Sequence, residues 1–351
     1  MTNEHLLARI NAELPSGIDW RAGALSYVRA IFEKRTRAFY ERYSCTKPLN
    51  SVGADDNWEP LLAECVHYLQ NFVNMVALLK MPPASRWLDV ACGGGWVSHY
   101  LARFGYKTFG FDVSDDMIEL ARKRLSEDPY LDLSPDSVRA MFASHDIERS
   151  PLPDHLRASF DVAVLESALH HFFDPIAALS HIAAALTDDG IAVIIEGENR
   201  IGPIKPEWLA VMREFDTLER PYPRVDLEAI FRAAGFEYYE FVAPISGWFS
   251  LRSPFAQNAN VHLESIAAAM NMAICAKSPA PLHRLFGPDC RRVSPPGSPL
   301  EPVQTKRQDS ENRGTENRGT ENRGTENRGT ENRGTENRGL KSIVNWFREV
   351  R

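Results

Sequence analysis

A glycine-rich turn follows the first short apolar run after the N-terminal region and could bind a ligand. Asp89 lies within this run, and Ala91, Gly93 and Gly95 come directly after it. A strand that ends in small residues and continues into a helix leaves room at its carboxyl end, where open α/β sheets bind ligands. Glycine lets the backbone approach a ligand closely, and the first N–H groups of a helix favour an electron-rich group. The turn is therefore predicted to be a ligand-binding loop.

Acidic residues also follow the later apolar runs, at positions where neighbouring strand ends would meet the same ligand. Asp112 ends the second run, nineteen residues after Gly93, and an acid there can accept hydrogen bonds from both ribose hydroxyls. Asp146 closes the third run, where it could meet the exocyclic amine of a purine while Ile147 packs on the ring. Glu166 follows the fourth run. Separate strand ends therefore present residue types suited to a nucleoside.

The glycine spacing argues against a nicotinamide dinucleotide as this ligand. The G-x-G-x-x-G fingerprint needs a third small residue for helix–strand packing. Counting from Gly93 puts Ser98 in that place, and counting from Ala91 puts Trp96 there. Serine replaces this glycine poorly and tryptophan does not replace it, so an NAD-dependent oxidoreductase is the weaker alternative.

The elements that would position these residues alternate from Arg86 onward between short apolar runs and helical patterns, which is typical of parallel α/β architecture. One helical pattern begins at Val97 and stops at Gly105, and another is opened by Ser114. The fold class is predicted to be α/β, with a doubly wound, seven-stranded, mostly parallel sheet. The seven strands are predicted around residues 87–90, 108–111, 138–143, 161–165, 191–195, 236–242 and 270–276.

The chain before and after this pattern divides into further predicted regions. Residues 1–80 show helical apolar spacing and form a predicted N-terminal cap that, with the insertion 199–224, would cover the ligand site. Residues 81–278 form the predicted α/β domain. Residues 279–310 are a proline-rich linker, in which nothing suggests a packed element.

The C-terminal region is a low-complexity repeat followed by a short amphipathic pattern. Residues 311–339 contain Glu-Asn-Arg-Gly six times, with threonine between the copies. Each unit has almost no apolar surface to bury, so the repeat is predicted to be a disordered linker. Residues 340–351 place Leu340, Ile343 and Phe347 on one helical face. This segment is either a frayed terminal helix or a docking helix for a protein partner or a membrane surface.

Composition excludes several other classes of function. A net charge of −7 with a pI near 5.9 argues against a surface that wraps nucleic acid. The apolar runs are too short to span a bilayer, and the N-terminus lacks the pattern of an export signal. Five scattered cysteines without a CxxC pair predict neither a disulfide framework nor a metal site. We therefore predict a cytoplasmic protein that acts on a small molecule.

These motifs resemble the class I S-adenosylmethionine-dependent methyltransferases, closest to the small-molecule type with an Asp-x-Gly-x-Gly-x-Gly loop. The resemblance spans Arg86 to Glu198 and implies a Rossmann-like methyltransferase fold, S-adenosylmethionine as cofactor, and methyl transfer. It implies that Ala91, Gly93 and Gly95 form the cofactor loop and that Asp89 supports this loop near the methionine amino group. It also implies that Asp112 holds the ribose and that Asp146 and Ile147 hold the adenine. Glu166 would face the methionine portion or the acceptor. Ala91 departs from the pattern, because it occupies the first glycine position and leaves slightly less room.

Methyl transfer from a sulfonium requires the nucleophile, the methyl carbon and the sulfur in one line, with water excluded. An oxygen or nitrogen acceptor also loses a proton, which a histidine or a carboxylate could accept. The candidate bases near the carboxyl edge of the sheet are Glu166, His170, His171, Glu196 and Glu198, of which His170, His171 and Glu198 are selected as catalytic candidates, with one of the two histidines preferred. The acceptor is predicted to be a small molecule that is methylated at O, N or C. A non-catalytic cofactor-binding protein and an aminopropyl transferase remain alternatives, although no acid-rich polyamine pocket supports the second.

Overall fold

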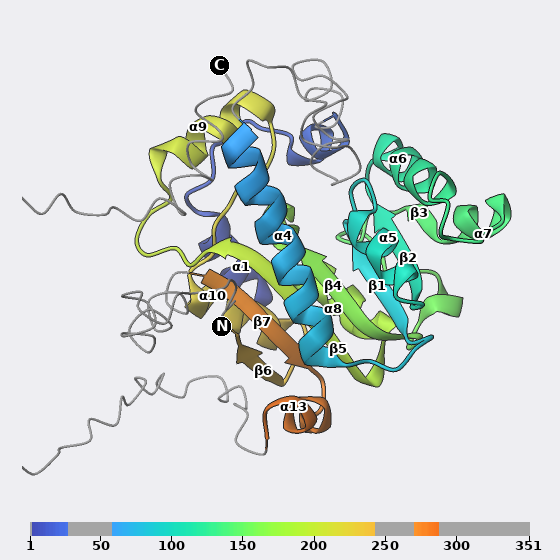
Figure 1. The fold of residues 1–351 in the computed structure, drawn as a ribbon. Helices are drawn as coiled ribbons and strands as arrows, with labels where there is room; N and C mark the ends of the chain where they lie inside the picture. The colour runs from blue at the N-terminus through green and yellow to red at the C-terminus, as the bar shows by residue number, and fades with distance from the viewer. Residues whose placement is uncertain (1, 27–57, 243–269, 288–351) are drawn as a thin grey trace, which may run out of the picture. The chain divides into compact units, whose positions relative to one another are not determined.

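A computed structural model describes residues 2–26, 58–242 and 270–287, in which strands and helices alternate along the chain (Figure 1). The strands are β1 (Arg86–Val90), β2 (Lys107–Asp112), β3 (Phe142–Ser144), β4 (Phe160–Glu166), β5 (Leu186–Glu198), β6 (Tyr238–Phe241) and β7 (Met270–Ala276). The helices are α1 (Asn3–Asn11), α4 (Trp58–Leu79), α5 (Trp96–Arg103), α6 (Asp115–Ser126), α7 (Pro135–Ala140), α8 (Pro175–Ala185), α9 (Pro206–Phe215), α10 (Arg224–Ala233) and α13 (Pro279–Phe286), with the 3₁₀ turns η2 (Asp154–Leu156) and η3 (Leu169–His171). The predicted repeat and terminal helix lie outside the described residues.

The strands form one seven-stranded sheet in the order β3-β2-β1-β4-β5-β7-β6. The pairs from β3 to β5 are parallel, whereas β7 runs antiparallel to both β5 and β6. Asp89 in β1 pairs with Gly110 in β2 and with Val164 in β4, so these three strands end at one edge. The predicted doubly wound, mostly parallel sheet is confirmed, and the ligand-binding edge lies where β1 to β4 end.

Helices cover both faces of this sheet (Figure 1), because successive side chains of each central strand point to opposite sides. Leu88 and Val90 of β1 belong to the cluster that includes α1, α8 and α10. Trp87, between Arg86 and Leu88, belongs to the opposite cluster with α4, α5 and α13. Strands buried on both faces are near-continuous apolar runs, as the sequence of β4 and the central part of β5 show.

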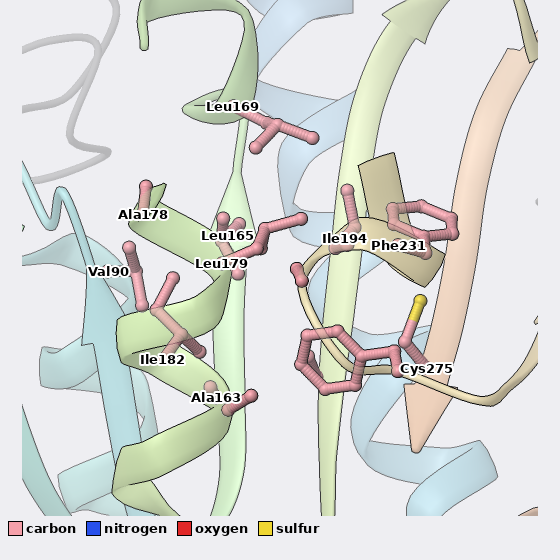
Figure 2. Packing of buried hydrophobic residues seen from close by; sticks show 14 of the residues in the cluster. Val90, Ala163, Leu165, Leu169, Ala178, Leu179, Ile182, Ile194, Phe231 and Cys275 are labelled. Atoms are coloured by element: carbon pink, nitrogen blue, oxygen red, sulfur yellow. The ribbon is translucent and has the colours of Figure 1, made fainter. Parts of the chain in front are cut away.

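The larger hydrophobic cluster holds the carboxyl edge of the sheet in a fixed position. Leu179 and Ile182 of α8 pack with Ala163 and Leu165 of β4, and all four side chains are almost completely buried (Figure 2). Each such leucine or isoleucine contributes roughly 1.5–3 kcal/mol when it is removed from water. Leu169 of η3 joins the same cluster, so the turn that follows β4 is anchored to the core.

One predicted strand is largely wrong. The prediction placed a strand at residues 138–143, but residues 135–140 form helix α7 and only Phe142–Ser144 pair with β2. Ser134 caps this helix, since its side chain accepts a hydrogen bond from the Ser137 N–H at 3.1 Å. Pro135 occupies the first helical turn, where its fixed φ and missing N–H are compatible with a helix. These local signals outweigh the apolar residues that suggested a strand.

A helix also lies where no packed element was predicted. Residues 279–286, within the predicted proline-rich linker, form α13, and Leu282 is completely buried. The helix packs against the cluster that contains Val193 and Ile274, because its apolar side chains complete that face of the sheet. The proline residues at its start are tolerated in a first turn.

Among the described residues, no helix is both long and apolar enough to cross a bilayer.

Candidate cofactor and acceptor site

A cavity of about 710 Å³ lies at the carboxyl edge of the sheet. Its volume is within the range of about 300–1,000 Å³ that is usual for ligand sites. The loops after β1, β2, β3 and β4 form one wall. The lining comprises Ala91 and Gly93, Phe111–Ser114, Met117, His145–Arg149, Ser167 and Ala168, His171–Asp174, Thr217 and Leu218, and, from the N-terminal segment, Ile18–Arg21 and Ala24. The cavity thus brings together Ala91, Gly93, Asp112, Asp146 and Ile147, as the sequence predicted.

The glycine-rich loop has an alternating left-handed backbone. Ala91, Gly93 and Gly95 have φ values of 50°, 50° and 71°, so Ala91 adopts a conformation that favours glycine. Asp112 ties this loop to β2, because one oxygen accepts the Gly93 N–H at 3.0 Å and the other accepts the Ser114 N–H at 2.9 Å. Burial raises the pKa of Asp112, against these backbone hydrogen bonds.

The two predicted loop glycines have different surroundings. A Cβ built on Gly93 would have no atom within 4 Å, whereas one built on Gly95 would lie 2.6 Å from the Ala121 Cβ on α6. Gly93 borders the cavity and Gly95 does not. Gly95 therefore allows α5 and α6 to approach each other, and Gly93 leaves space for a ligand.

We expect Gly95→Ala to lower the free energy of unfolding by roughly 2–4 kcal/mol, because overpacking and a strained backbone act together. Gly93→Ala is the matched control and should cost about 1 kcal/mol, from its left-handed backbone alone. Urea unfolding followed by circular dichroism measures both. Equal losses for the two variants would contradict the assignment of Gly95 to helix packing.

Asp89 lies beneath the loop rather than on the cavity wall. It is buried, and one oxygen accepts hydrogen bonds from the Ser98 N–H at 2.9 Å and the Ser98 hydroxyl at 2.7 Å. Burial raises the pKa of Asp89 to about 7, the hydrogen bonds from Ser98 oppose this, and the charge of Asp112 adds to it. Asp89 thereby fixes the start of α5 against the end of β1.

The purine end of the predicted site contains two side chains that the sequence analysis missed. Asp146 accepts a hydrogen bond from the Arg21 Nε at 2.9 Å, and Ile147 is buried on the wall beside it. Glu148 also lines the cavity and accepts the Asp174 N–H at 2.6 Å. Burial raises the pKa of Glu148 to about 7, assisted by the charge of Asp146 and opposed by the Asp174 hydrogen bond. Arg21 has no motif around it, and 125 positions separate it from its partner.

Glu166 ends β4 but does not border the cavity, although the next residue, Ser167, does. One of its carboxylate oxygens is buried and has no hydrogen-bond partner among the described residues. Burial raises its pKa well above the usual value, and the nearby charges of Glu196 and Asp89 add to this. Burial therefore favours the neutral form of Glu166.

The two predicted histidine bases have different environments. His170 does not line the cavity, and its Nδ1 lies 2.6 Å from a Glu196 oxygen while its Nε2 lies 3.4 Å from a Glu219 oxygen. Burial lowers the pKa of His170, but the charges of Glu196 and Glu219 outweigh this and raise it to about 10. His170 is thus a cation near neutral pH and is unsuited to accept a proton.

His171 is the predicted base that does line the cavity. Its Nδ1 lies 2.6 Å from the Leu218 carbonyl oxygen, which only accepts, so Nδ1 carries the proton. Burial and the charge of His170 lower the pKa of His171.

Glu198, the third candidate, does not border the cavity and pairs with Lys205 at 2.6 Å and 2.9 Å. His171, His170 and Glu219 also bring one potential metal-ligand atom each within 4.8 Å of one another, a closeness that the ion pairs of His170 already explain.

The N-terminal segment and the 199–224 insertion both reach the cavity, as expected, but through few residues. Trp20 and its neighbours line it from the first segment, and Thr217 and Leu218 line it from the insertion. Trp208 and Met212 do not line the cavity but belong to a small apolar cluster that also contains Leu218 and Trp20. This cluster packs α9 against the N-terminal segment. The insertion therefore contributes more to holding the N-terminal segment in place than to lining the cavity.

Comparison with known proteins identifies a family and several relatives of this chain. The methyltransferase domain family matches residues 62–240, which are 179 of the 351 residues. The chain is 28% identical over 160 residues to the ubiquinone biosynthesis O-methyltransferase of Actinobacillus pleuropneumoniae, covering 46% of this chain and 59% of that protein. It is 31% identical over 127 residues to an S-adenosyl-L-methionine-dependent Diels–Alderase of Talaromyces variabilis, covering 36% of this chain and 41% of that protein.

Two further proteins are similar over longer stretches. The demethylmenaquinone methyltransferase of Symbiobacterium thermophilum is 27% identical over 239 residues, covering 60% of this chain and 84% of that protein. The crystal structure of a magnesium protoporphyrin IX methyltransferase from Synechocystis with bound S-adenosylmethionine is 16% identical with a TM-score of 0.47, covering 75% of this chain and 100% of that one. The chain belongs to the methyltransferase-domain family, and its strand order and glycine-rich loop are those of the class I, S-adenosylmethionine-dependent type.

Proposed function

We propose that this protein transfers the methyl group of S-adenosylmethionine to a small-molecule acceptor. The observation that carries the proposal is the convergence of the Gly93 loop, Asp112 and the Asp146–Ile147 pair on one cavity. Family membership supports the same reaction class. The proposed contacts of Ala91, Gly93, Asp112, Asp146 and Ile147 are those that the resemblance assigned, whereas Asp89, Gly95 and Glu166 do not border the cavity.

The residues present fit this cofactor. The space that a Cβ on Gly93 would enter is open, so the methionine portion can approach the loop backbone. Asp112 borders the cavity, and its carboxylate is suited to two ribose hydroxyls. Asp146 would share its carboxylate between Arg21 and the adenine amine, and Ile147 would pack on the ring. Gly95 acts indirectly, through the approach of α5 and α6.

When bound, the cofactor supplies an activated methyl group on a positively charged sulfur. The chain then has to align the acceptor and exclude water. Trp20, Phe172 and Phe173 supply apolar surface around the cavity, which lowers the access of water to the reacting atoms. His171 accepts the acceptor proton through Nε2, because Nδ1 already carries a proton. His170 and Glu198 take no direct part in this mechanism.

The acceptor is proposed to be an uncharged, largely apolar molecule that is methylated at a hydroxyl oxygen. The wall beside His171 consists of Phe172, Phe173, Thr217 and Leu218, and such a mixture of apolar surface with few polar groups is usual for small organic ligands. A hydroxyl group is an acceptor that needs a base. Relatives named as O-methyltransferases of ubiquinone biosynthesis support the choice of oxygen.

The remaining expectations from the sequence are kept as proposals. The α/β domain is proposed to cover residues 81–286, since α13 packs on its sheet. The terminal segment 340–351 is proposed to be either a frayed helix or a docking helix for a protein partner or a membrane surface. A cytoplasmic location is proposed because five scattered cysteines suit a reducing compartment.

Calorimetry with S-adenosylmethionine, S-adenosylhomocysteine and NAD tests the cofactor, and mass spectrometry of a panel of phenolic acceptors tests the reaction. We expect both sulfur compounds to bind and NAD not to bind, with one S-adenosylhomocysteine formed for each methylated product. Binding of NAD alone would refute the proposal. Conversion of a substrate without consumption of S-adenosylmethionine would favour chemistry like that named for the Talaromyces relative.

A further inference from the structure

The His170 side chain is held between two buried carboxylates, one at each ring nitrogen. Glu196 lies 2.6 Å from Nδ1 and Glu219 lies 3.4 Å from Nε2. An ionised carboxylate only accepts hydrogen bonds, and a neutral imidazole has a single N–H. Both contacts are therefore satisfied together only when His170 is an imidazolium. Glu196 and Glu219 are 5% and 6% exposed, so water replaces neither contact easily.

The turn that carries the two histidines is fixed from both sides. The second oxygen of Glu196 accepts the Ala168 and Leu169 N–H groups at 3.2 Å and 2.7 Å. On the other side, Arg220 donates to the Phe172 carbonyl at 2.6 Å and Tyr222 donates to the Leu169 carbonyl at 3.3 Å. The backbone of η3 is thus held by strand β5 and by the segment before α10.

His171 lies against this fixed cation. The two imidazole ring centroids are 4.1 Å apart, and two cations at this distance repel each other strongly inside a protein. The Leu218 carbonyl orients the His171 ring through Nδ1, and Leu218 directly precedes Glu219. The residue that binds His170 and the residue that orients His171 are therefore neighbours in one short segment.

We propose that His170 is a positioning residue, whose fixed imidazolium keeps the neighbouring His171 in the uncharged form that accepts the proton of the methyl acceptor. This inference rests on the proposed function, because it assigns His171 as the base of that reaction. It explains why one member of the histidine pair lines the cavity while its neighbour is enclosed by acids.

Charged groups of both signs act on His171, and the positive charge of His170 favours the uncharged form that accepts a proton. Glu219, whose oxygen lies 3.9 Å from the His171 Nδ1, and Glu196 from β5 both favour a charged His171. The positive charge of His170 opposes them. Glu166 is the remaining acid near Glu196, and burial raises its pKa well above the usual value, which favours its neutral form. Without the His170 charge, the two glutamates would act on His171 unopposed at short range.

The test is an NMR titration of the imidazole groups in full-length, ¹⁵N-histidine-labelled protein, for the wild type, His170→Gln and His170→Lys. We expect the wild-type His170 to stay doubly protonated beyond pH 8. In His170→Gln the titration midpoint of His171 should rise by about 1 pH unit or more, because a neighbouring charge acts on this scale. In His170→Lys, which restores a cation between the two glutamates, at least half of that rise should disappear.

Two controls separate charge from structure. His155→Gln changes an exposed histidine on η2 and should leave the His171 midpoint unchanged. Affinity for S-adenosylhomocysteine, measured by calorimetry, should stay within about threefold in both His170 variants if the fold is intact, since His170 does not border the cavity.

Three results would overturn the inference: a wild-type His170 that loses a proton near pH 6–7, an unchanged His171 midpoint in His170→Gln, or a divalent cation bound between the histidines and Glu219. The titration needs neither cofactor nor acceptor. Failure of the wild type to bind S-adenosylmethionine would therefore refute the proposed function separately, without deciding the state of His170.

Discussion

Replacement of His171 by glutamine is expected to lower kcat for methyl transfer by about 10²–10⁴-fold, the usual contribution of a general base. Glutamine keeps a similar size and can still donate to the Leu218 carbonyl, but it does not accept a proton. Initial rates of S-adenosylhomocysteine formation with a phenolic acceptor measure the loss. Affinity for S-adenosylhomocysteine should change little, because the base acts on the acceptor.

The same reaction should depend on pH through His171. Only its neutral form accepts a proton, so the rate should rise with pH through the pKa of His171 and stay level above it. Burial and the charge of His170 lower this pKa, so the rise should lie at more acidic pH than for an ordinary histidine. Glu148, with a pKa raised to about 7, lines the same cavity, and cofactor affinity should therefore be measured at each pH.

A decrease in kcat of less than threefold for His171→Gln would exclude His171 as the base.

The second large effect is expected for Asp112→Ala, which should weaken binding of S-adenosylmethionine and S-adenosylhomocysteine by about 10²–10⁴-fold. Two charge-assisted hydrogen bonds to the ribose are worth about 1.5–3 kcal/mol each, and every 1.4 kcal/mol corresponds to about tenfold. The variant also removes the acceptor for the Gly93 N–H, so the loop itself is less well held. Calorimetry at constant pH and salt concentration measures both affinities.

Two variants make this result specific. Asp112→Asn keeps a single acceptor oxygen and turns its NH2 group toward either the Gly93 N–H or the Ser114 N–H, so one of these two backbone contacts is lost. This variant should bind more weakly than the wild type and more tightly than Asp112→Ala. Asp132→Ala removes an exposed acid from the loop before α7 and should bind like the wild type. An Asp112→Ala protein that binds within threefold of the wild type would show that the cofactor ribose lies elsewhere.

Local sequence patterns were sufficient for most of the fold. The apolar run 87–90 followed by glycine predicted β1 and its loop, and Ser114 marked the start of α6, where its side chain accepts the Met117 N–H. These signals work because a buried strand and a helix cap depend on residues close together in the chain. The same reasoning failed at residues 138–143 and at α13, where short apolar groups fit either a strand, a helix or a loop.

Residue patterns alone predicted the seven-stranded α/β sheet. They also predicted the strand-end residues that border one cavity, because parallel strands bring their carboxyl ends to one edge whatever lies between them. These residues are Ala91, Gly93, Asp112, Asp146 and Ile147. The folded structure was needed to show that His171 lines the cavity while His170 lies between Glu196 and Glu219, and that Arg21 pairs with Asp146. Charge and burial at a side chain depend on groups that packing brings together, and no local spacing in the chain shows which distant groups those are.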